Sequence, residues 1–295
     1  MLTDLPRYVE RDPELGVLLH KFRSAGKRLF LLTNSGPEYT HAMMSYLLGG
    51  ALEEYPNWRN YFDFTITAAK KPSFFTGKTP FVDAKTSAQT SAPERGQLYL
   101  GGNIADLERA LGYSGDEVLY VGDHIYGDVL RAKKESTWRT AMIIQEMDDE
   151  LRVHREHSVS FERSASLEQT RDAVQDQLRE QQARLKRVDR KLVDPDLGSE
   201  KASFEAKRVL HRRSIDRLRA QLKELDAERT ELDGALDQAF HPFWGSVFKA
   251  GSEVSSFGSQ IEQYAGIYTS RASNLDQYSP MHYFRSPRHR MPHEL

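Results

Sequence analysis

The chain has 295 residues, of which 39% are hydrophobic and 28% are charged, and its formal net charge is −2. This length suits one large α/β domain with additions or two domains, and the balanced charge gives no general attraction to nucleic acid or to an acidic membrane. The absence of cysteine excludes disulfides, and the absence of a signal segment or a long apolar stretch leads us to expect a soluble, cytoplasmic protein.

Predicted strands and helices alternate through the first 150 residues. Helices are predicted near 13–25 and 38–48, from 104 to 111 and through 129–132, and strands at 29–32, 61–67, 118–121 and 140–144. Residues 73–97 are rich in Thr, Ser, Lys and Gly and are expected to form an excursion, with a hairpin around 81–83. The alternation favours an α/β fold with a parallel sheet flanked by helices.

The run Val118-Leu119-Tyr120-Val121 is typical of a short strand that is buried on both faces. Gly122 allows a tight turn, and Asp123 and Asp128 follow at the carboxyl end of the strand, where open α/β sheets bind ligands. Two carboxylates there could hold a hard cation, most plausibly Mg²⁺. The plainer alternative is that they cap the next helix.

Two other predicted strands end in polar groups of a complementary kind. Thr33, Asn34 and Ser35 offer hydroxyl, amide and backbone donors for an anion at a helix start. Lys70 and Lys71 precede a proline, and a lysine there could neutralise a phosphate. Taken singly, the first group could be an N-cap and the lysines could be surface charge, but all three strand ends together describe a phosphate-handling site.

Residues 163–237 carry apolar residues at heptad spacing on two segments that are separated by Asp194-Pro195-Asp196-Leu197-Gly198. This pattern predicts an antiparallel helical hairpin, with Arg171 and Gln181 interrupting the first seam. Acidic residues alternate with the basic ones, so the charges indicate a solvated surface and not a nucleic-acid site.

Residues 240–295 are rich in aromatic, Gly and Ser residues and are expected to form helices and loops that pack back on the first domain. The predicted domains are therefore 1–160, 161–239 and 240–295. The hairpin and the aromatic segment are also candidate contact surfaces between copies, so we expect a homo-oligomer.

Thr33-Asn34-Ser35, Lys71-Pro72 and Gly122-Asp123 with Asp128 resemble motifs two, three and four of the haloacid dehalogenase (HAD) superfamily of phosphotransferases. Five longer strings narrow the resemblance to the cytosolic purine (IMP/GMP-type) 5′-nucleotidases: Lys71-Pro72-Ser73-Phe74-Phe75, Gly101-Gly102-Asn103, Gly122-Asp123-His124-Ile125-Tyr126-Gly127-Asp128, Trp138-Arg139-Thr140 and Met291-Pro292-His293-Glu294. The resemblance covers nearly the whole chain, apart from a lengthened hairpin. It implies a HAD-like, Rossmann-type core.

The resemblance implies Mg²⁺-dependent hydrolysis of a purine nucleoside 5′-monophosphate through an aspartyl-phosphate. Asn34 and Ser35 would bind phosphate oxygens, and Thr33 would shape their turn. Lys71 would neutralise charge on the phosphoryl group and the nucleophile. Asp123 would bind Mg²⁺, and Asp128 would bind the ion or its water shell.

A nucleotide-effector region of animal members of that family is matched by Tyr126, Gln260 and Tyr264. Gln263 stands where those members have arginine, which puts effector binding by this chain in doubt.

The family's first motif, a strand followed by Asp-x-Asp, has no match in this sequence, and neither has the cap segment that follows it. Because that motif supplies the nucleophile, we expect the HAD-like core to be incomplete at its amino terminus and the chain alone to be inactive. Residues 1–295 could be the carboxyl-terminal part of a nucleotidase. Alternatively, they could be an inactive protein that binds phosphate or Mg²⁺, or a coiled-coil interaction protein.

Overall fold

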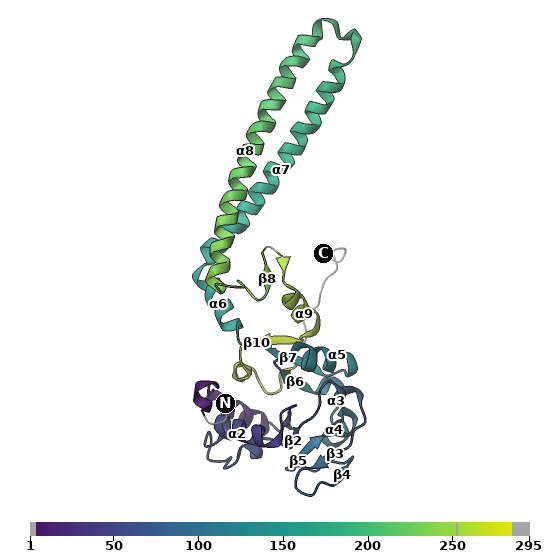
Figure 1. The fold of residues 1–295 in the computed structure, drawn as a ribbon, viewed down its shortest axis with the longest axis vertical. Coiled ribbons are helices and arrows are strands. Elements are labelled where there is room, and N and C mark those ends of the chain that lie inside the picture. The colour runs from purple at the N-terminus through teal and green to yellow at the C-terminus, as the bar shows by residue number, and fades with distance from the viewer. Residues whose placement is uncertain (1–3, 252, 285–295) are drawn as a thin grey trace. The chain divides into compact units, whose positions relative to one another are not determined.

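The computed structural model describes residues 4–251 and 253–284, without the side chains of 195–197. The chain divides into two compact units, Met1–Met147 with Ser256–Leu295 and Asp148–Ser255. The first unit has the predicted α/β character, with parallel strands and covering helices (Figure 1). The α/β fold class and the helical hairpin are therefore confirmed.

The first sheet of this unit has five strands in the order β1-β2-β5-β3-β4. Their bounds are β1 Phe30–Leu32, β2 Phe64–Thr67, β5 Leu98–Gly101, β3 Phe81–Asp83 and β4 Gln89–Thr90. The strands β1, β2 and β5 are parallel, whereas β3 and β4 form the expected antiparallel hairpin and pair with β5 through β3.

The second sheet is parallel and has the order β10-β7-β6. Its strands are β6 Leu119–Gly122, β7 Arg139–Ile143 and β10 Ile267–Thr269. The sequence did not predict β10, because three residues between Gly266 and Ser270 are too short for a periodic signal. Pairing with β7 determines its conformation, including the hydrogen bond from the Ile144 N–H to the Thr269 carbonyl at 2.8 Å.

Short helices cover these sheets and position the loops at the strand ends. The α-helices are α1 Glu14–Ser24, α2 Pro37–Leu48, α3 Ser73–Thr76, α4 Ile104–Leu111, α5 Arg131–Glu135 and α9 Ser256–Tyr264. A π-helix spans Ile125–Leu130, and 3-10 helices span Leu5–Arg7, Trp58–Tyr61, Gly115–Glu117 and Ala272–Gln277. Asn103 caps α4 by accepting from the Asp106 N–H at 3.0 Å, and Gly112 ends the helix with a left-handed φ of 72°.

One hydrophobic core lies under both sheets. It contains Leu32, Phe64 and Ile66 of the first sheet together with Tyr120 of the second sheet and the adjacent Val118. The predicted burial of β6 on both faces is wrong, since Val121 is 37% exposed. The reason is that β6 is an edge strand, where one row of neighbouring side chains is missing.

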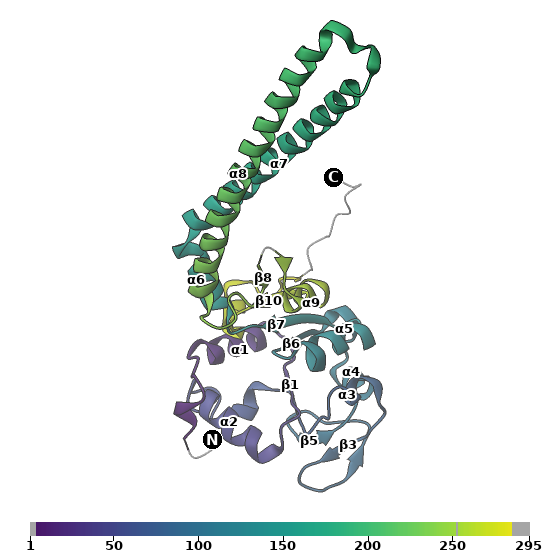
Figure 2. The same ribbon diagram turned by 45° about the horizontal axis from the view of Figure 1, so that its top comes forward.

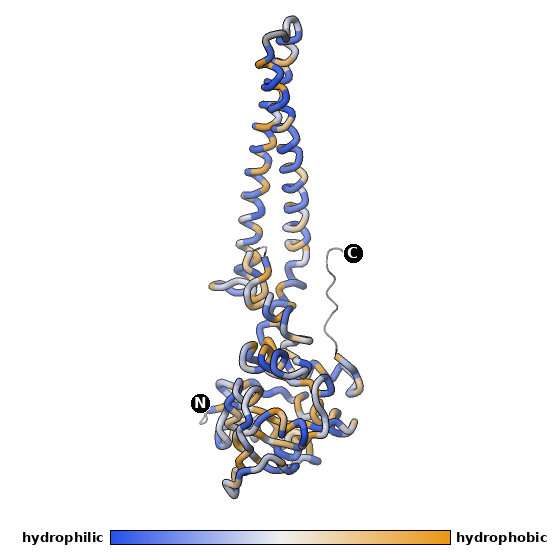
Figure 3. The backbone as a smooth tube through the Cα atoms, turned by 90° about the vertical axis from the view of Figure 1, so that its right-hand side faces the viewer, coloured by the Kyte–Doolittle hydropathy of each residue, from blue (hydrophilic) through white to orange (hydrophobic). Residues whose placement is uncertain are grey.

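The second unit contains α6 Met147–Glu156, α7 Ser158–Leu192, α8 Lys201–Phe240 and the strands β8 Lys249–Ala250 and β9 Glu253–Val254. The helices α7 and α8 lie side by side, and many of their residues are hydrophilic (Figure 3). Their seam includes Val174, Leu178, Ile215 and Leu218, as the heptads predict.

The two residues that interrupt the seam have polar partners on α8. Arg171 donates to Asp226 at 2.8 Å, and Gln181 Oε1 lies 2.8 Å from His211 Nδ1. These pairs explain how the seam continues through both positions. In the part of the chain that is described, none of the helices has the length and apolar character needed to cross a membrane.

Candidate active site

The loops that follow β1 and β2 are held together by Asn34 and Lys71. The Lys71 backbone N–H donates to Asn34 Oδ1 at 2.6 Å, and Asn34 Nδ2 donates to the Lys71 carbonyl at 3.0 Å. Because both ends of the amide are used, Asn34 fixes the position and direction of the Lys71 peptide. The sequence assigned Asn34 to phosphate binding and did not anticipate this contact.

Backbone contacts extend the junction between the two loops. The Ala68 N–H donates to the Ser35 carbonyl at 2.8 Å, and the Ala69 N–H donates to the Thr33 carbonyl at 3.0 Å. Ala68 and Lys70 have left-handed φ values of 45° and 57°. Such conformations cost free energy in non-glycine residues and persist where surrounding contacts enforce them.

The Lys71 ammonium lies between the ends of β1 and β6. Its Nζ is 2.6 Å from Asp128 Oδ1, 2.9 Å from the Tyr120 hydroxyl and 3.4 Å from the Leu32 carbonyl. The side chains of Lys71 and Asp128 are only 11% and 6% exposed, so the ion pair is strongly shielded from water. Lys71 is therefore a fixed positive charge at the point where the strand ends meet.

Tyr120 completes this cluster from within β6. Its hydroxyl donates to Asp128 Oδ1 at 2.9 Å. Burial and the adjacent Asp128 carboxylate raise the pKa of Tyr120 far above the usual value of 10.0. The phenol consequently stays neutral and can share Asp128 Oδ1 with Lys71. The sequence predicted Tyr120 as a buried strand residue, and the one signal of another role was its hydroxyl in an otherwise aliphatic strand.

Asp128 is buried on the π-helix, and both of its polar contacts fall on Oδ1. Its Oδ2 lies toward Gly122, where an added Cβ would stand 2.8 Å from Oδ2 and 2.7 Å from Asp128 Cβ. Asp123, by contrast, is exposed. Gly122 therefore provides the space in which the Asp128 carboxylate sits.

The alternative that these polar residues cap the helices that follow them is not what the structure shows. The N-cap of α2 is Gly36, without a side-chain cap, and Thr33 Oγ1 instead accepts from the Ser35 N–H at 3.1 Å. At the π-helix, His124 is the N-cap and accepts from the Gly127 N–H at 2.9 Å. The hydroxyls and carboxylates at these strand ends therefore have no helix-capping role.

The oxygen donors at this site suit Mg²⁺ in kind but provide only part of a coordination shell. Mg²⁺ prefers carboxylate oxygens and octahedral geometry. Asp123 and Asp128 offer two carboxylates, and no group of three or more His, Cys, Asp or Glu residues that could hold a metal is found among residues 4–251 and 253–284. The residues fit one side of a Mg²⁺ site.

The three residues of the predicted effector region belong to the same unit. Gln260 Nε2 donates to the Tyr126 hydroxyl at 3.2 Å. The Lys134 ammonium lies 5.5 Å from the centre of the Tyr264 ring, and the Tyr264 carbonyl accepts from Thr140 Oγ1 at 3.0 Å. The fold thus brings Tyr126 and Gln260 together. Effector binding at these residues stays a prediction.

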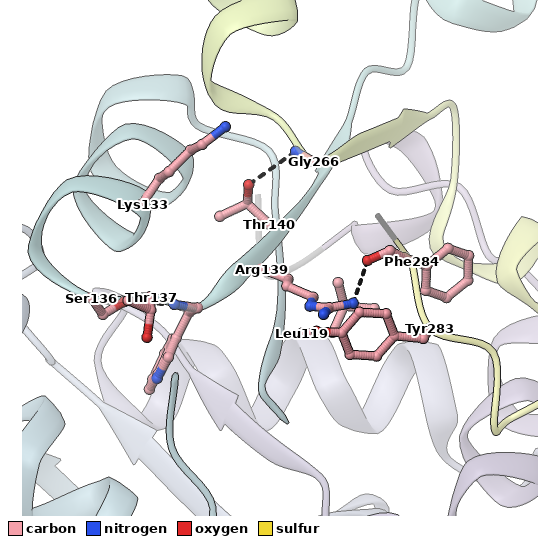
Figure 4. A pocket seen from close by; sticks show the side chains of 10 residues that line it. Leu119, Lys133, Ser136, Thr137, Arg139, Thr140, Gly266, Tyr283 and Phe284 are labelled. Atoms are coloured by element: carbon pink, nitrogen blue, oxygen red, sulfur yellow. Dashed lines mark hydrogen bonds between the residues drawn. The ribbon is translucent and has the colours of Figure 1, made fainter. Parts of the chain in front are cut away.

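A pocket of about 420 Å³ lies apart from the Lys71 cluster, beside β7 and Gly266 (Figure 4). Arg139 crosses it, stacks on the Tyr283 ring and donates to the Phe284 carbonyl. Arg139 thereby attaches the segment that ends at 284 to β7. The string Met291–Glu294 lies outside the described residues.

Sequence comparison identifies similar proteins along the whole chain. A model of the 5′ nucleotidase family matches residues 1–295. A 5′-nucleotidase domain-containing protein of Dictyostelium discoideum is 29% identical over 303 aligned positions, covering 100% of this chain and 45% of that protein. The 5′-nucleotidase domain-containing protein 2 of Homo sapiens is 37% identical over 156 residues, covering 51% of this chain and 29% of that protein. The matched part of the chain thus covers less than half the length of each of these relatives.

Proposed function

This chain belongs to the 5′ nucleotidase family, and from that membership we propose that it forms the phosphate- and metal-binding part of an enzyme that hydrolyses purine nucleoside 5′-monophosphates such as IMP and GMP. The observation that carries the proposal is the Lys71 ammonium, 2.6 Å from Asp128 and fixed through its own backbone by Asn34. A shielded cation of this kind suits a transferring phosphoryl group.

In this proposal each polar residue has one role in phosphoryl transfer. Ser35 and the backbone beside Asn34 bind phosphate oxygens, and Thr33 holds their turn through its hydrogen bond to the Ser35 N–H. Lys71 offsets the negative charge of the phosphoryl group and orients it. These are positioning and electrostatic tasks, which supply most of the catalysis in phosphoryl transfer.

Asp123 and Asp128 would hold Mg²⁺. The bound ion would neutralise charge on the phosphoryl oxygens. Lys71 and Tyr120 keep Asp128 Oδ1 occupied, so Oδ2 is the Asp128 atom that would contact the ion or its water shell.

The nucleophile is an aspartate outside residues 1–295. Its carboxylate oxygen forms a bond to phosphorus while the ester bond to the nucleoside O5′ breaks, and O5′ takes up a proton from water. Water then cleaves the aspartyl-phosphate and releases phosphate. Residues 1–295 alone are therefore expected to be inactive.

A second candidate is that residues 1–295 bind phosphate or Mg²⁺ without turnover, or act through the α7–α8 hairpin as an interaction protein. Asp128 Oδ1 already accepts hydrogen bonds from Lys71 and Tyr120. A site whose side chains are held in this way supports binding without turnover. In either case the hairpin is a candidate contact surface for a second copy.

Phosphate release from IMP and GMP with Mg²⁺ tests both candidates. It is measured for residues 1–295 and for a longer form that carries an upstream Asp-x-Asp segment. We expect release only from the longer form, and Lys71→Met in that form should abolish it. An inactive longer form with an intact Asp-x-Asp would overturn the nucleotidase proposal, and equal activity of both forms would show that the attacking group lies within residues 1–295.

A further inference from the structure

Charge is unevenly distributed along the helical hairpin of the second unit. Residues 184–219, which include its turn, contain twice as many Lys and Arg as Asp and Glu, whereas 158–183 and 220–240 together contain fewer than half as many. The hairpin therefore has a basic half at its turn and an acidic half at its open end. The helix α8 extends through both halves, and the predominant sign of its charges changes near Ala220.

One side of α8 is exposed along most of its length. The opposite side packs on α7 through Ile215 and Leu218, and Figure 2 shows the two helices running beside each other. The positions turned away from this seam recur at alternate spacings of four and three residues, from Ala206 to Gly234. All of these positions are exposed. We call them the outer face of α8.

The outer face carries two arginines in the basic half and two glutamates in the acidic half. Arg213 and Arg217 lie one turn apart, and Glu224 and Glu231 follow further along the helix. Among residues 4–251 and 253–284 none of these four has an ion-pair partner, because the ion pairs within the hairpin use other residues. Like charges one turn apart destabilise an isolated helix. The outer face thus presents charge of both signs that the chain itself does not neutralise.

Between these charges the outer face is nearly flat. Ala206, Ala220, Ala227 and Gly234 have side chains of one carbon or none, and Leu210 is 61% exposed. Two helices approach each other more closely where the side chains at their contact are small. The outer face therefore has room for a second helix and charges for that helix to offset.

We propose that the outer face of α8 binds the same face of α8 in a second copy of this chain, with the two helices antiparallel and a two-fold axis near Ala220. A residue before Ala220 then lies opposite the residue equally far after it in the second copy. Arg217 is placed beside Glu224 of the second copy, and Arg213 lies opposite Ala227, one turn from both glutamates. By symmetry every such pair occurs twice.

The residues that flank the outer face fit the same arrangement. Asp216 is an acid in the basic half and Lys223 is a base in the acidic half, and both are exposed. In the antiparallel pair Asp216 lies near Lys223 of the second copy, so this local reversal of sign is matched as well. A nucleic acid or an acidic membrane along α8 would instead be repelled by Glu224 and Glu231. The proposal concerns contact between copies and does not depend on the nucleotidase activity.

Charge reversal tests the pairing in sedimentation of residues 1–295. Arg213→Glu with Arg217→Glu makes the outer face acidic in both halves, and Glu224→Arg with Glu231→Arg makes it basic in both halves. Each double variant should raise the dimer Kd by about 100-fold, because like charges then face each other. An equimolar mixture of the two double variants should form heterodimers with a Kd close to that of the unchanged chain, since an acidic face meets a basic one.

The matched control is Arg187→Glu with Arg190→Glu, which reverses two exposed cations of the basic half on α7. It should leave the dimer Kd within about twofold, since exposed charges outside a contact contribute little. An unchanged chain that is monomeric at about 100 µM would overturn the proposal. So would a mixture that fails to associate, or RNA binding by a monomeric chain that is lost equally in the control and in the Arg213 and Arg217 variant.

Cysteine crosslinking tests the direction of the helices, because the chain has no cysteine of its own. Ala220→Cys should form a disulfide between copies on mild oxidation, since near the axis the two Cα atoms come within the roughly 4–7 Å that a disulfide requires. Ala206→Cys should not crosslink to itself, because its two copies would lie about 40 Å apart at 1.5 Å per residue. Its mixture with Gly234→Cys should crosslink. Crosslinking of Ala206→Cys to itself would indicate parallel helices and overturn the proposal.

Discussion

Asn34 and Lys71 exchange two hydrogen bonds between side chain and backbone, at 2.6 Å and 3.0 Å. This pair determines where the Lys71 side chain begins, and the Asp128 carboxylate determines where it ends. The lysine is thus held at both ends before any ligand arrives. Such preorganisation is the main source of electrostatic catalysis.

Asn34→Ala in the longer, active form should lower kcat for IMP by about 10- to 100-fold, since misplacement of a positioned group by about 1 Å can cost that much. The matched control is Asn57→Ala, which removes a comparable contact to the Arg59 N–H at 3.0 Å in the 3-10 helix after Pro56. Both variants should lose about 1 kcal/mol of unfolding free energy. An equal loss of kcat in the two variants would show that Asn34 acts only through stability.

Lys71→Met should destabilise residues 1–295 by about 3–5 kcal/mol, because it leaves the Asp128 carboxylate buried without its cation. Adding Asp128→Leu should recover much of the loss. The control is Arg109→Met, which breaks a pair between Arg109 and Asp106 in which the arginine side chain is 68% exposed, and should cost less than about 1 kcal/mol. If the losses of unfolding free energy caused by Lys71→Met and Asp128→Leu simply add in urea unfolding, the two residues are not a coupled pair.

Tyr120 should make the unfolding free energy depend on alkaline pH. Its pKa is raised in the folded state by burial and by Asp128, so its contribution is complete below the usual value of 10.0 and declines as the pH rises above it. The expected slope is about −1.4 kcal/mol per pH unit for one proton. Tyr120→Phe should reduce this slope. The control Tyr126→Phe, at an exposed tyrosine, should leave the slope unchanged. The unfolding free energy of both variants is measured by urea unfolding from about pH 8 to about pH 11.

Gly122→Ala should displace Asp128, since the added Cβ would lie 2.7 Å from Asp128 Cβ. We expect a loss of about 1–3 kcal/mol from overpacking and weaker protection of the longer form by Mg²⁺ against thermal unfolding. Gly234→Ala is the control, because Gly234 lies within α8 with open space around it. That change should stabilise the hairpin by about 0.5–1 kcal/mol. Unchanged Mg²⁺ protection in the Gly122 variant would argue against Asp128 as a ligand.

Leu178→Ala in the hairpin seam should cost about 2–5 kcal/mol, because Leu178 is buried against α8. Val193→Ala, at a position 82% exposed, should change the unfolding free energy by less than about 0.5 kcal/mol. Circular dichroism during urea unfolding of the full chain measures both. Equal effects would mean that α7 and α8 do not pack through the predicted seam.

The parts of the fold that depend on local pattern were predictable from the sequence. The heptads of α7 and α8 indicated their hairpin, and the apolar runs located β1, β2, β6 and β7 within one to three residues. Two features required contacts between distant residues. The strand β10 exists only by pairing with β7, and the division into two sheets depends on which strand edges meet.

The candidate site divides in the same way. Thr33, Lys71, Asp123 and Asp128 were predicted as site residues because each follows an apolar strand, and strand ends in a parallel sheet converge. The sequence alone determined the family and the hairpin and predicted the residue types of the candidate site, since motifs, heptads and polar strand ends are short-range patterns. Only the tertiary structure decided that Asn34 fixes Lys71, that Tyr120 joins the ion pair and that Val121 stays exposed. Those outcomes depend on distances and burial between residues far apart in the chain, which no local periodicity encodes.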